Sequence, residues 1–304
     1  TLDRSSAASD VYKRQDIGGT FIKYGLIDEN GEILEKHELA TEASKGGEQI
    51  LEKVLKIVEA YKNKSEVEGV AISTAGMVDT KNGSIRYASD LIPGYTGINF
   101  KKPIKEKFDL PCHVENDVNC AGLAEYKAGA GKNSKIALIL TIGTGIGGCA
   151  IINGELYHGV NGSAMEIGYM NMENSTFETL GSAKILVEKL ANLKGDSPEN
   201  WDGKKIFELA KNGDEICIKA IDEMCEVLAI GISNIVYVLN PDTVILGGGI
   251  MAQEEYLYEK LDKNLEKYLE KPLYDCLSLK FARKQNAAGM LGAFYNFQSK
   301  EAKN

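Results

Sequence analysis

Two stretches of this 304-residue chain share an order of elements that strongly limits its possible folds. Each stretch predicts a strand, then a loop of glycine and threonine, then a β-hairpin. The first spans residues 16–34 and the second spans residues 136–157. Helical and strand patterns follow each copy, so each copy is an α/β unit. Two copies of one α/β unit predict two domains whose Gly/Thr loops lie opposite each other across a cleft.

Side-chain periodicity places the remaining elements. The DENG sequence at 28–31 is a hairpin turn, and Asn153-Gly154 is a second one. The helix after the first hairpin has one apolar face, made by Ile50, Val54, Leu55, Val58 and Tyr61. Short apolar runs predict strands at 68–73, 135–142 and 243–250, and helical patterns predict helices at 182–192, 203–212, 214–239 and about 288–298.

The composition excludes several classes of protein. Hydrophobic residues make up 43% of the chain, which is enough for the cores of two domains. The net charge of −9 argues against a nucleic-acid-binding protein, because such proteins usually have a basic face. No apolar run reaches the length of a membrane span, and the N-terminus has no apolar signal region. We therefore expect a cytoplasmic protein that binds neither membrane nor nucleic acid.

The cysteines and histidines give no metal-binding pattern. The six cysteines form no C-x-x-C pair, and we expect reduced, mostly buried thiols. The three histidines, His37, His113 and His158, are too scattered to indicate a metal site.

The second glycine loop, GTGIGG, also matches G-x-G-x-x-G through Gly143, Gly145 and Gly148. That fingerprint must open a helix, whereas here it opens β-branched sequence and a hairpin, so a Rossmann fold is not supported. A Gly/Thr turn inside a hairpin can still bind phosphate through its N–H groups and hydroxyl. One such loop would most simply be a tight turn without a ligand. Two loops and a third glycine cluster at 247–249 favour a nucleoside triphosphate site.

Carboxylates occur where phosphoryl transfer needs them. Asp117 follows Glu115 and Asn116 at a junction between an extended segment and a helix. Asp117 or Asn116 could simply cap that helix; alternatively, Asp117 could take the proton from an attacking hydroxyl. Glu166 and Glu178 lie in a polar stretch, 161–181. They are either solvated surface acids or carboxylates that bind sugar hydroxyls.

Taken together, these motifs resemble the ROK family of repressors and sugar kinases. The resemblance covers residues 16–297 and rests on DIGGT (16–20), END (115–117), GTGIGG (143–148), NGSAMEIG (161–168) and LGGGI (246–250). It implies an α/β, actin-like fold of two ribonuclease-H-type domains around an ATP cleft. We place the N-terminal domain at 1–117 and the C-terminal domain at 118–287, and expect the last helix, about 288–304, to pack back on the first domain.

The resemblance also implies a role for each matching residue. Asp117 matches the catalytic base, and Asp16 matches the acid that organises Mg²⁺ through water. The residues that match contacts to ATP are Gly18, Gly19, Thr20, Thr144, Gly145, Gly247 and Gly248. Those that match contacts to the sugar are Gly76, Ser89, Asn116, Glu166 and Glu178. The resemblance further implies a homodimer and the transfer of the ATP γ-phosphate to a hexose hydroxyl.

This chain departs from the family pattern at positions that bind zinc and contact the sugar in most members. Most members carry a zinc-binding His where Tyr169 stands here, followed by a cysteine-rich segment that this chain lacks. We therefore predict no zinc, a nearest relative in a zinc-free subgroup, and a sugar contact by the Tyr169 hydroxyl. Met165 also replaces the usual Gly. Glucose, a β-glucoside and N-acetylmannosamine all remain open as substrates.

The sequence leaves two other functions open, and its first 15 residues are unusual for the family. A ROK regulator that lacks its DNA-binding domain is an alternative; only 15 residues precede DIGGT. An actin-like structural ATPase is another, although it would not need the END and EIG motifs. Residues 1–15 contain only Val11 and Tyr12 as favourable strand residues, where the family has an apolar strand. We interpret 1–15 as non-native sequence; the alternative is a divergent strand that pairs through its backbone.

Overall fold

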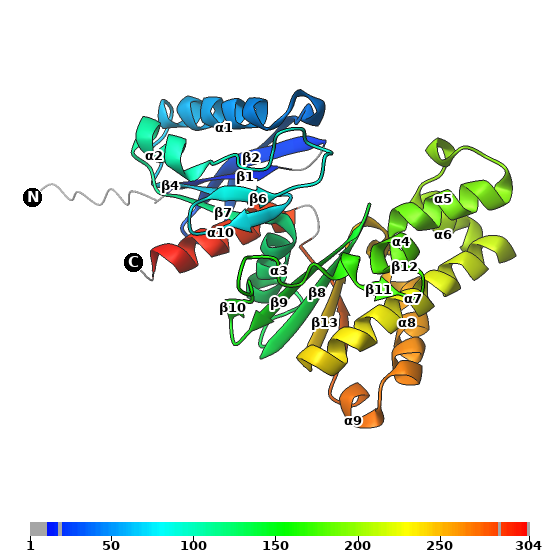
Figure 1. Ribbon diagram of the computed structural model, residues 1–304. Coiled ribbons are helices and arrows are strands. Elements are labelled where there is room, and N and C mark those ends of the chain that lie inside the picture. Colours follow the sequence, from blue (N-terminus) through cyan, green and yellow to red (C-terminus); the bar gives the residue numbers. More distant parts are fainter. Residues whose placement is uncertain (1–10, 18–19, 285–286, 303–304) are drawn as a thin grey trace, which may run out of the picture. The chain divides into compact units, whose positions relative to one another are not determined.

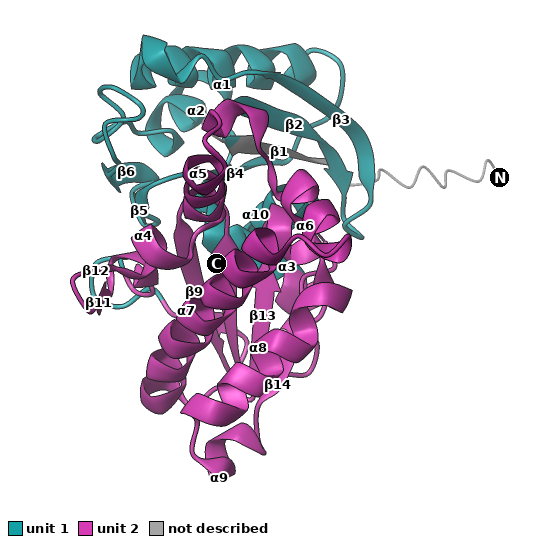
Figure 2. Cartoon of the chain, turned by 90° about the vertical axis from the view of Figure 1, so that its right-hand side faces the viewer, with its two compact units in different colours: residues 1–124, 158–163, 286–304 teal, residues 125–157, 164–285 magenta. Residues whose placement is uncertain are grey.

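The computed structural model describes residues 11–17, 20–284 and 287–302 (Figure 1). The chain divides into two compact units. Unit 1 contains residues 1–124, 158–163 and 286–304, and unit 2 contains residues 125–157 and 164–285 (Figure 2). The observed division falls within a helix, after Ala124, and not after Asp117 as we predicted. The first turns of that helix belong to unit 1 because Ala124 packs into a cluster with Ala288, Met290 and Leu291 near the end of the chain.

The elements of unit 1 form a five-stranded sheet with helices on both faces. Its strands are β1 (Val11–Ile17), β2 (Phe21–Asp28), β3 (Ile33–Ala40), β4 (Gly69–Thr74) and β7 (Cys112–Asn116), with a small hairpin of β5 (Met77–Asp79) and β6 (Ser84–Tyr87). Its helices are α1 (Gly47–Lys62), α2 (Lys101–Phe108), the start of α3 (Asp117–Ala128) and α10 (Ala288–Glu301). The strand order is β3-β2-β1-β4-β7.

Alternation along β4 explains the two covered faces of this sheet. Val70 and Ile72 belong to the core cluster that α1 and α2 complete, whereas Ala71 packs with Cys120 of α3 and Phe297 of α10. Successive side chains of a strand point to opposite faces, so a continuous apolar run is buried on both. Figure 1 shows α1 and α10 on opposite sides of the sheet. The final helix packs against β1, β4 and β7 of unit 1.

Unit 2 repeats the topology of unit 1. Its sheet contains β8 (Ile136–Ile142), β9 (Ile146–Ile152), β10 (Glu155–Leu156), β13 (Thr243–Gly247) and β14 (Ser278–Phe281), in the order β10-β9-β8-β13-β14. In both units, an antiparallel hairpin leads into parallel strands. The repeat that the sequence predicts at 16–34 and 136–157 is therefore confirmed.

The remaining elements of unit 2 cover its sheet. They are β11 (Asn171–Met172), β12 (Ser175–Thr176), α4 (Phe177–Gly181), α5 (Ala183–Lys194), α6 (Gly203–Lys211), α7 (Glu215–Leu239), α8 (Glu254–Tyr268) and α9 (Lys271–Tyr274). Leu138, Leu140 and Ile142 of β8 pack with the buried faces of α5 to α8 in one core. The sequence missed β14 and the short elements of 167–181, because runs of two to five residues have no measurable period.

Strand β1 is longer than the sequence indicated. It includes Val11 to Ile17 and pairs on both edges, antiparallel to β2 and parallel to β4. Our expectation that only Val11 and Tyr12 favour a strand was too narrow, since main-chain pairing on both sides fixes the extended conformation. Residues 1–10, the rest of the segment that we interpret as non-native, lie outside the described residues.

Most cysteines are buried free thiols, as the sequence predicted. Burial raises the pKa of Cys112 and Cys225 to about 12, which keeps both groups protonated. Cys276 is exposed.

Candidate active site

Three motifs predicted for the site follow the carboxyl ends of parallel strands of unit 1 in sequence. Ile17, Thr74 and Asn116 occupy the same level of β1, β4 and β7. The Gly-Gly-Thr, Ala-Gly and Asp117 positions of the three motifs follow these residues in sequence. In open α/β sheets, ligands bind beyond the carboxyl ends of parallel strands. The topology therefore brings the STAG and END motifs to one edge, next to the end of β1.

Asn116 is the centre of the hydrogen bonds at this edge. Its Nδ2 donates to the carbonyl oxygen of Gly76 and to Oδ1 of Asp117, each at 3.0 Å. Its Oδ1 accepts the backbone N–H groups of Val118 (2.9 Å) and Asn119 (3.1 Å), which makes it a cap of α3. Asn116 is thus both a helix cap and a neighbour of the candidate base. Because both amide hydrogens are engaged, a sugar hydroxyl would have to share or displace one of them.

Asp117 begins α3 and is half-buried. Its Oδ1 also accepts the N–H of Val118 at 2.9 Å, and a helix N-terminus favours negative charge. Nearby, the hydroxyl of buried Tyr95 forms a 2.5 Å hydrogen bond with Oγ1 of Thr74. Burial raises the pKa of Tyr95 well above its usual range, the hydrogen bond with Thr74 opposes this, and the charge of Asp117 adds to it. Tyr95 therefore stays neutral beside the carboxylate.

In unit 2, the second Gly/Thr loop and the third glycine cluster lie at the same sheet edge. β8 and β13 are parallel neighbours, with Thr141 beside Gly247. Thr144 and Gly145 follow β8, while Gly248 follows β13. The residues predicted to contact phosphate and adenosine are therefore brought together by strand pairing.

The backbone of these loops has a conformation that requires glycine at one position and is open to ligands at two others. Gly248 has φ +107°, and a Cβ there would collide with the carbonyl oxygen of Ile142, so only glycine fits. A Cβ added at Gly143 or Gly249 would meet no atom within 4 Å. The N–H of Gly143 donates to the carbonyl oxygen of Gly145 at 2.9 Å, which closes the first of these turns. Open space beside glycine main chain is what a bound phosphate requires.

One carboxylate lies beside the loop that follows β8, and a second interacts with it. Oε2 of Glu178 occupies the space that a Cβ on Gly145 would need, and lies 2.9 Å from the Cβ position of Gly168. Glu166 is exposed as a whole residue, yet its carboxyl group is partly desolvated. This desolvation and the charge of Glu178 raise the pKa of Glu166. Two interacting acids at a loop of accessible backbone can accept hydrogen bonds from a polyhydroxylated ligand.

The remaining predicted site residues are either exposed or not covered by the described part of the chain. Tyr169 is 56% exposed at the end of a short 3₁₀ helix, Ile167–Tyr169. Ser89 is exposed, as are Thr20 and Thr144. The side chain of Asp16, and Gly18 and Gly19 entirely, lie outside the described residues.

The described residues offer neither a metal-binding cluster nor a membrane-spanning helix. Among the side chains that the structure describes, no group of three His, Cys, Asp or Glu residues could hold a metal ion. Within the same part of the chain, no helix is long and apolar enough to cross a membrane.

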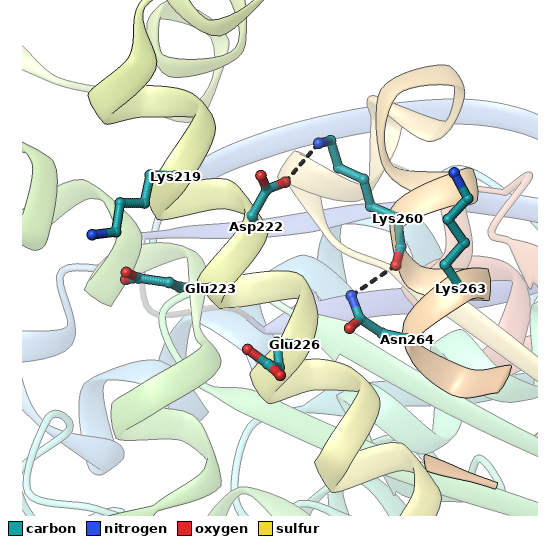
Figure 3. Close-up of a pocket in the computed structure, with 7 residues that line it drawn as sticks. All are labelled: Lys219, Asp222, Glu223, Glu226, Lys260, Lys263 and Asn264. Carbon is teal, nitrogen blue, oxygen red and sulfur yellow. Dashed lines mark hydrogen bonds and ion pairs between the residues drawn. The ribbon is translucent and has the colours of Figure 1, made fainter. Parts of the chain in front are cut away.

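A groove between α7 and α8 contains charged side chains but none of the predicted site residues (Figure 3). Its lining carries three lysines and three acids that balance in charge: Lys219, Lys260, Lys263, Asp222, Glu223 and Glu226, with Asn264. Lys260 and Asp222 form an ion pair at 2.6 Å. Both side chains of this pair are partly exposed, as is common for ion pairs on a solvated surface.

Sequence reasoning missed one polar contact and one electrostatic interaction near END. Glu115 is buried and contacts His158, which is 43 residues away. Tyr95 interacts with Asp117 from a loop that had no motif. Neither pairing leaves a local pattern, because strand–loop packing alone brings these residues together.

Known proteins match this chain over most of its length. The ROK family model matches residues 15–300. An uncharacterised protein of Clostridium perfringens is 48% identical over 93% of this chain and 96% of its own length. A β-glucoside kinase of Listeria monocytogenes is 32% identical over 94% of this chain and 97% of its own.

Solved structures agree in fold. A Listeria monocytogenes protein proposed to be an N-acetylmannosamine kinase has a TM-score of 0.86 and 32% identity, covering 96% of this chain and 99% of that one. A ROK family glucokinase from Streptomyces griseus was solved with glucose and AMPPNP. It has a TM-score of 0.79 and 27% identity, and the match covers 93% of this chain and 97% of that one. The two α/β units have the actin-like two-domain fold of these kinases. The chain belongs to the ROK family.

Proposed function

We propose that this chain is an ATP-dependent sugar kinase that transfers the γ-phosphate of ATP to a hydroxyl of a hexose, with Asp117 as general base. The observation that carries the proposal is the position of Asp117. It lies at the carboxyl end of parallel strands, at a helix N-terminus, with its carboxylate held by the amide of Asn116. A fixed carboxylate can accept the proton of an attacking hydroxyl in phosphoryl transfer.

The glycine loops of unit 2 support ATP as the donor. The accessible backbone at Gly143 and Gly249 fits phosphate oxygens, and Gly247 and Gly248 would lie against adenosine. When bound, Mg·ATP supplies the phosphoryl group. The family resemblance assigns Asp16 to Mg²⁺ and Gly18, Gly19 and Thr20 to the phosphates; Asp16 is the sixth residue of β1 in sequence. The chain then contributes orientation and charge, which is most of what phosphoryl transfer requires of a protein.

The acids of unit 2 and the loops of unit 1 support a sugar as the acceptor. Glu166 and Glu178 would accept hydrogen bonds from sugar hydroxyls, and Tyr169 would add a hydroxyl. The family resemblance also assigns sugar contacts to Gly76, Ser89 and Asn116 of unit 1. The relatives act on glucose and β-glucosides by their names, and a glucose-like hexose is our first choice. N-acetylmannosamine and a β-glucoside are the alternatives.

One assay tests this function. ADP release from Mg·ATP is measured with glucose, cellobiose or N-acetylmannosamine, each against a reaction without sugar. We expect at least one sugar to stimulate ADP release and to yield a sugar phosphate detectable by mass spectrometry. If no sugar raises ADP release above the sugar-free rate, the proposed kinase activity is wrong.

Further properties are proposed with the function. We expect dependence on Mg²⁺, a homodimer and a cytoplasmic enzyme. We also expect no bound zinc, because Tyr169 stands where most members of the family have a zinc-binding His. Elemental analysis of purified protein and light scattering during gel filtration would test the zinc and dimer expectations.

A further inference from the structure

Glu115 is a buried carboxylate that the proposed mechanism does not use. Its side chain is 1% exposed and lies one residue before the Asn116-Asp117 pair. Its Oε1 accepts the backbone N–H of Asn116 at 3.0 Å and the side-chain amide of Asn119 at 2.9 Å. Its Oε2 lies 2.8 Å from Nε2 of His158. A carboxylate this deeply buried is stable only when it is paired and hydrogen-bonded, as Glu115 is here.

The partner His158 begins a segment with an unusual place in the chain. Residues 158–163 belong to unit 1, although the residues on both sides belong to unit 2. The segment packs on the β5–β6 hairpin, since a Cβ on Gly162 would lie 2.8 Å from the carbonyl oxygen of Val78. The contact between His158 and Glu115 therefore ties this segment to the junction of β7 and α3.

Glu115 also restrains Asn116 in two ways, directly and through Asn119. It holds the backbone N–H of Asn116, and it holds Asn119, whose own backbone N–H donates to Oδ1 of Asn116. Asn116 in turn donates to Oδ1 of Asp117. One continuous set of hydrogen bonds therefore runs from His158 to the candidate base.

We propose that Glu115 and His158 form a positioning pair for Asp117. The N–H of His158 fixes the Glu115 carboxylate, which orients Asn116, and Asn116 holds Asp117 in the direction of the attacking hydroxyl. Neither member touches the substrate. The proposal rests on the proposed kinase function, because it assigns Asp117 the role of base. A displacement of about 1 Å of a catalytic group can cost about a hundredfold in rate, so a positioning pair has a measurable effect.

The test compares variants of His158 in the full-length protein. His158→Leu removes the donor, whereas His158→Gln keeps an N–H of similar reach. We expect His158→Leu to lower kcat at least about tenfold, with KM values for sugar and ATP changed by less than about threefold. His158→Gln should recover most of that loss.

A matched control comes from the same strand. His113 of β7 forms a similar pair with Glu301, at 2.7 Å, and its ring packs on Phe297, so both of these partners lie on α10. His113→Leu should lower thermal stability without changing kcat per folded molecule. A purely structural role for His158 predicts the same behaviour for both histidines. The proposal is overturned if His158→Leu keeps kcat within about twofold of wild type. It is also overturned if His158→Gln lowers kcat as much as His158→Leu does.

Two further measurements keep the proposal testable. If His158→Leu does not fold, His158→Asn, whose amide is shorter, replaces it and should fall below His158→Gln in kcat. If wild type phosphorylates no sugar, the kinase proposal fails by itself, and hydrogen exchange then tests the pair. The Leu variant should speed exchange of the 116–119 amides, and unchanged exchange there would reject the pair.

Discussion

The carboxylate of Glu178 fills the space into which a side chain on Gly145 would point. The atom in the way is the end of a flexible side chain, and Gly145 has no positive φ. We therefore expect Gly145→Ala to fold normally but to push the Glu178 carboxylate aside. The KM for sugar should rise by about tenfold, a loss of roughly 1.4 kcal/mol in binding.

The matched control for that variant is Gly143→Ala, in the same loop. A Cβ at Gly143 meets no protein atom within 4 Å, so Glu178 should stay in place. Steady-state kinetics in sugar and in ATP should separate the two variants. Equal sugar KM values for both would show that Glu178 does not connect Gly145 to the sugar.

Replacing Asp117 by Asn should remove nearly all turnover. The amide keeps an oxygen that can accept the N–H of Val118, so α3 should still form, but it cannot take up a proton. We expect kcat to fall by about a hundredfold or more, with sugar binding within about threefold of wild type by calorimetry. A rate near that of wild type would exclude Asp117 as the base.

Glu166→Gln should stabilise the protein while weakening its substrate binding. Desolvation and the charge of Glu178 raise the pKa of Glu166 in the folded state above its ordinary value of 4.5. The folded state then binds the proton more tightly than the unfolded state, so stability falls as pH rises through the raised pKa. At pH 7 the charged group destabilises the fold, and glutamine removes that cost.

Thermal unfolding at two pH values measures this effect. The variant should have the higher melting temperature at pH 7, and the difference should shrink as pH falls toward the ordinary glutamate pKa. A lower melting temperature for Glu166→Gln at pH 7 would contradict the electrostatic argument. A stabilised variant with reduced sugar affinity is the usual exchange of stability for function at a binding site.

Gly292→Ala should strongly destabilise unit 1. A Cβ at this position of α10 would overlap the main chain of α3 at Cys120, and backbone atoms cannot move aside as a side-chain end can. We expect a loss of about 2–3 kcal/mol in the free energy of unfolding, measured by urea denaturation. Lys300→Ala, in the same helix, is the control and should change stability by less than about 0.5 kcal/mol. Equal stability of the two variants would refute the close approach of α10 and α3.

Local chemistry explains which elements the sequence could predict. The DENG turn was found because its residues act within the turn: Oδ1 of Asp28 accepts the N–H groups of Asn30 and Glu32, at 3.0 and 2.7 Å. The face of α1 was found because its apolar residues follow the helical period, and Ile50, Val54, Val58 and Tyr61 are buried. Leu55, which we also assigned to that face, is only partly buried.

The parts that could not be predicted depend on distant partners. Strand β1 has no apolar pattern over Lys13 to Gln15, and its two paired edges belong to β2 and β4. The END motif was recognisable, but the contact of Glu115 with His158 depends on how residues 158–163 return to unit 1. The motif can be recognised in the sequence, whereas the partner of a buried acid is visible only in three dimensions.

The return of residues 158–163 has a practical consequence for dissecting the molecule. The chain passes between the units at 124/125, 157/158, 163/164 and 285/286, so neither unit is one continuous piece of polypeptide. No single truncation or proteolytic nick can release a complete unit. An attempt to express unit 1 alone must join residue 124 to residue 286 and must supply the six residues at 158–163 as a separate strand of chain. Without that peptide, the isolated unit would leave the acid of the END motif without its histidine.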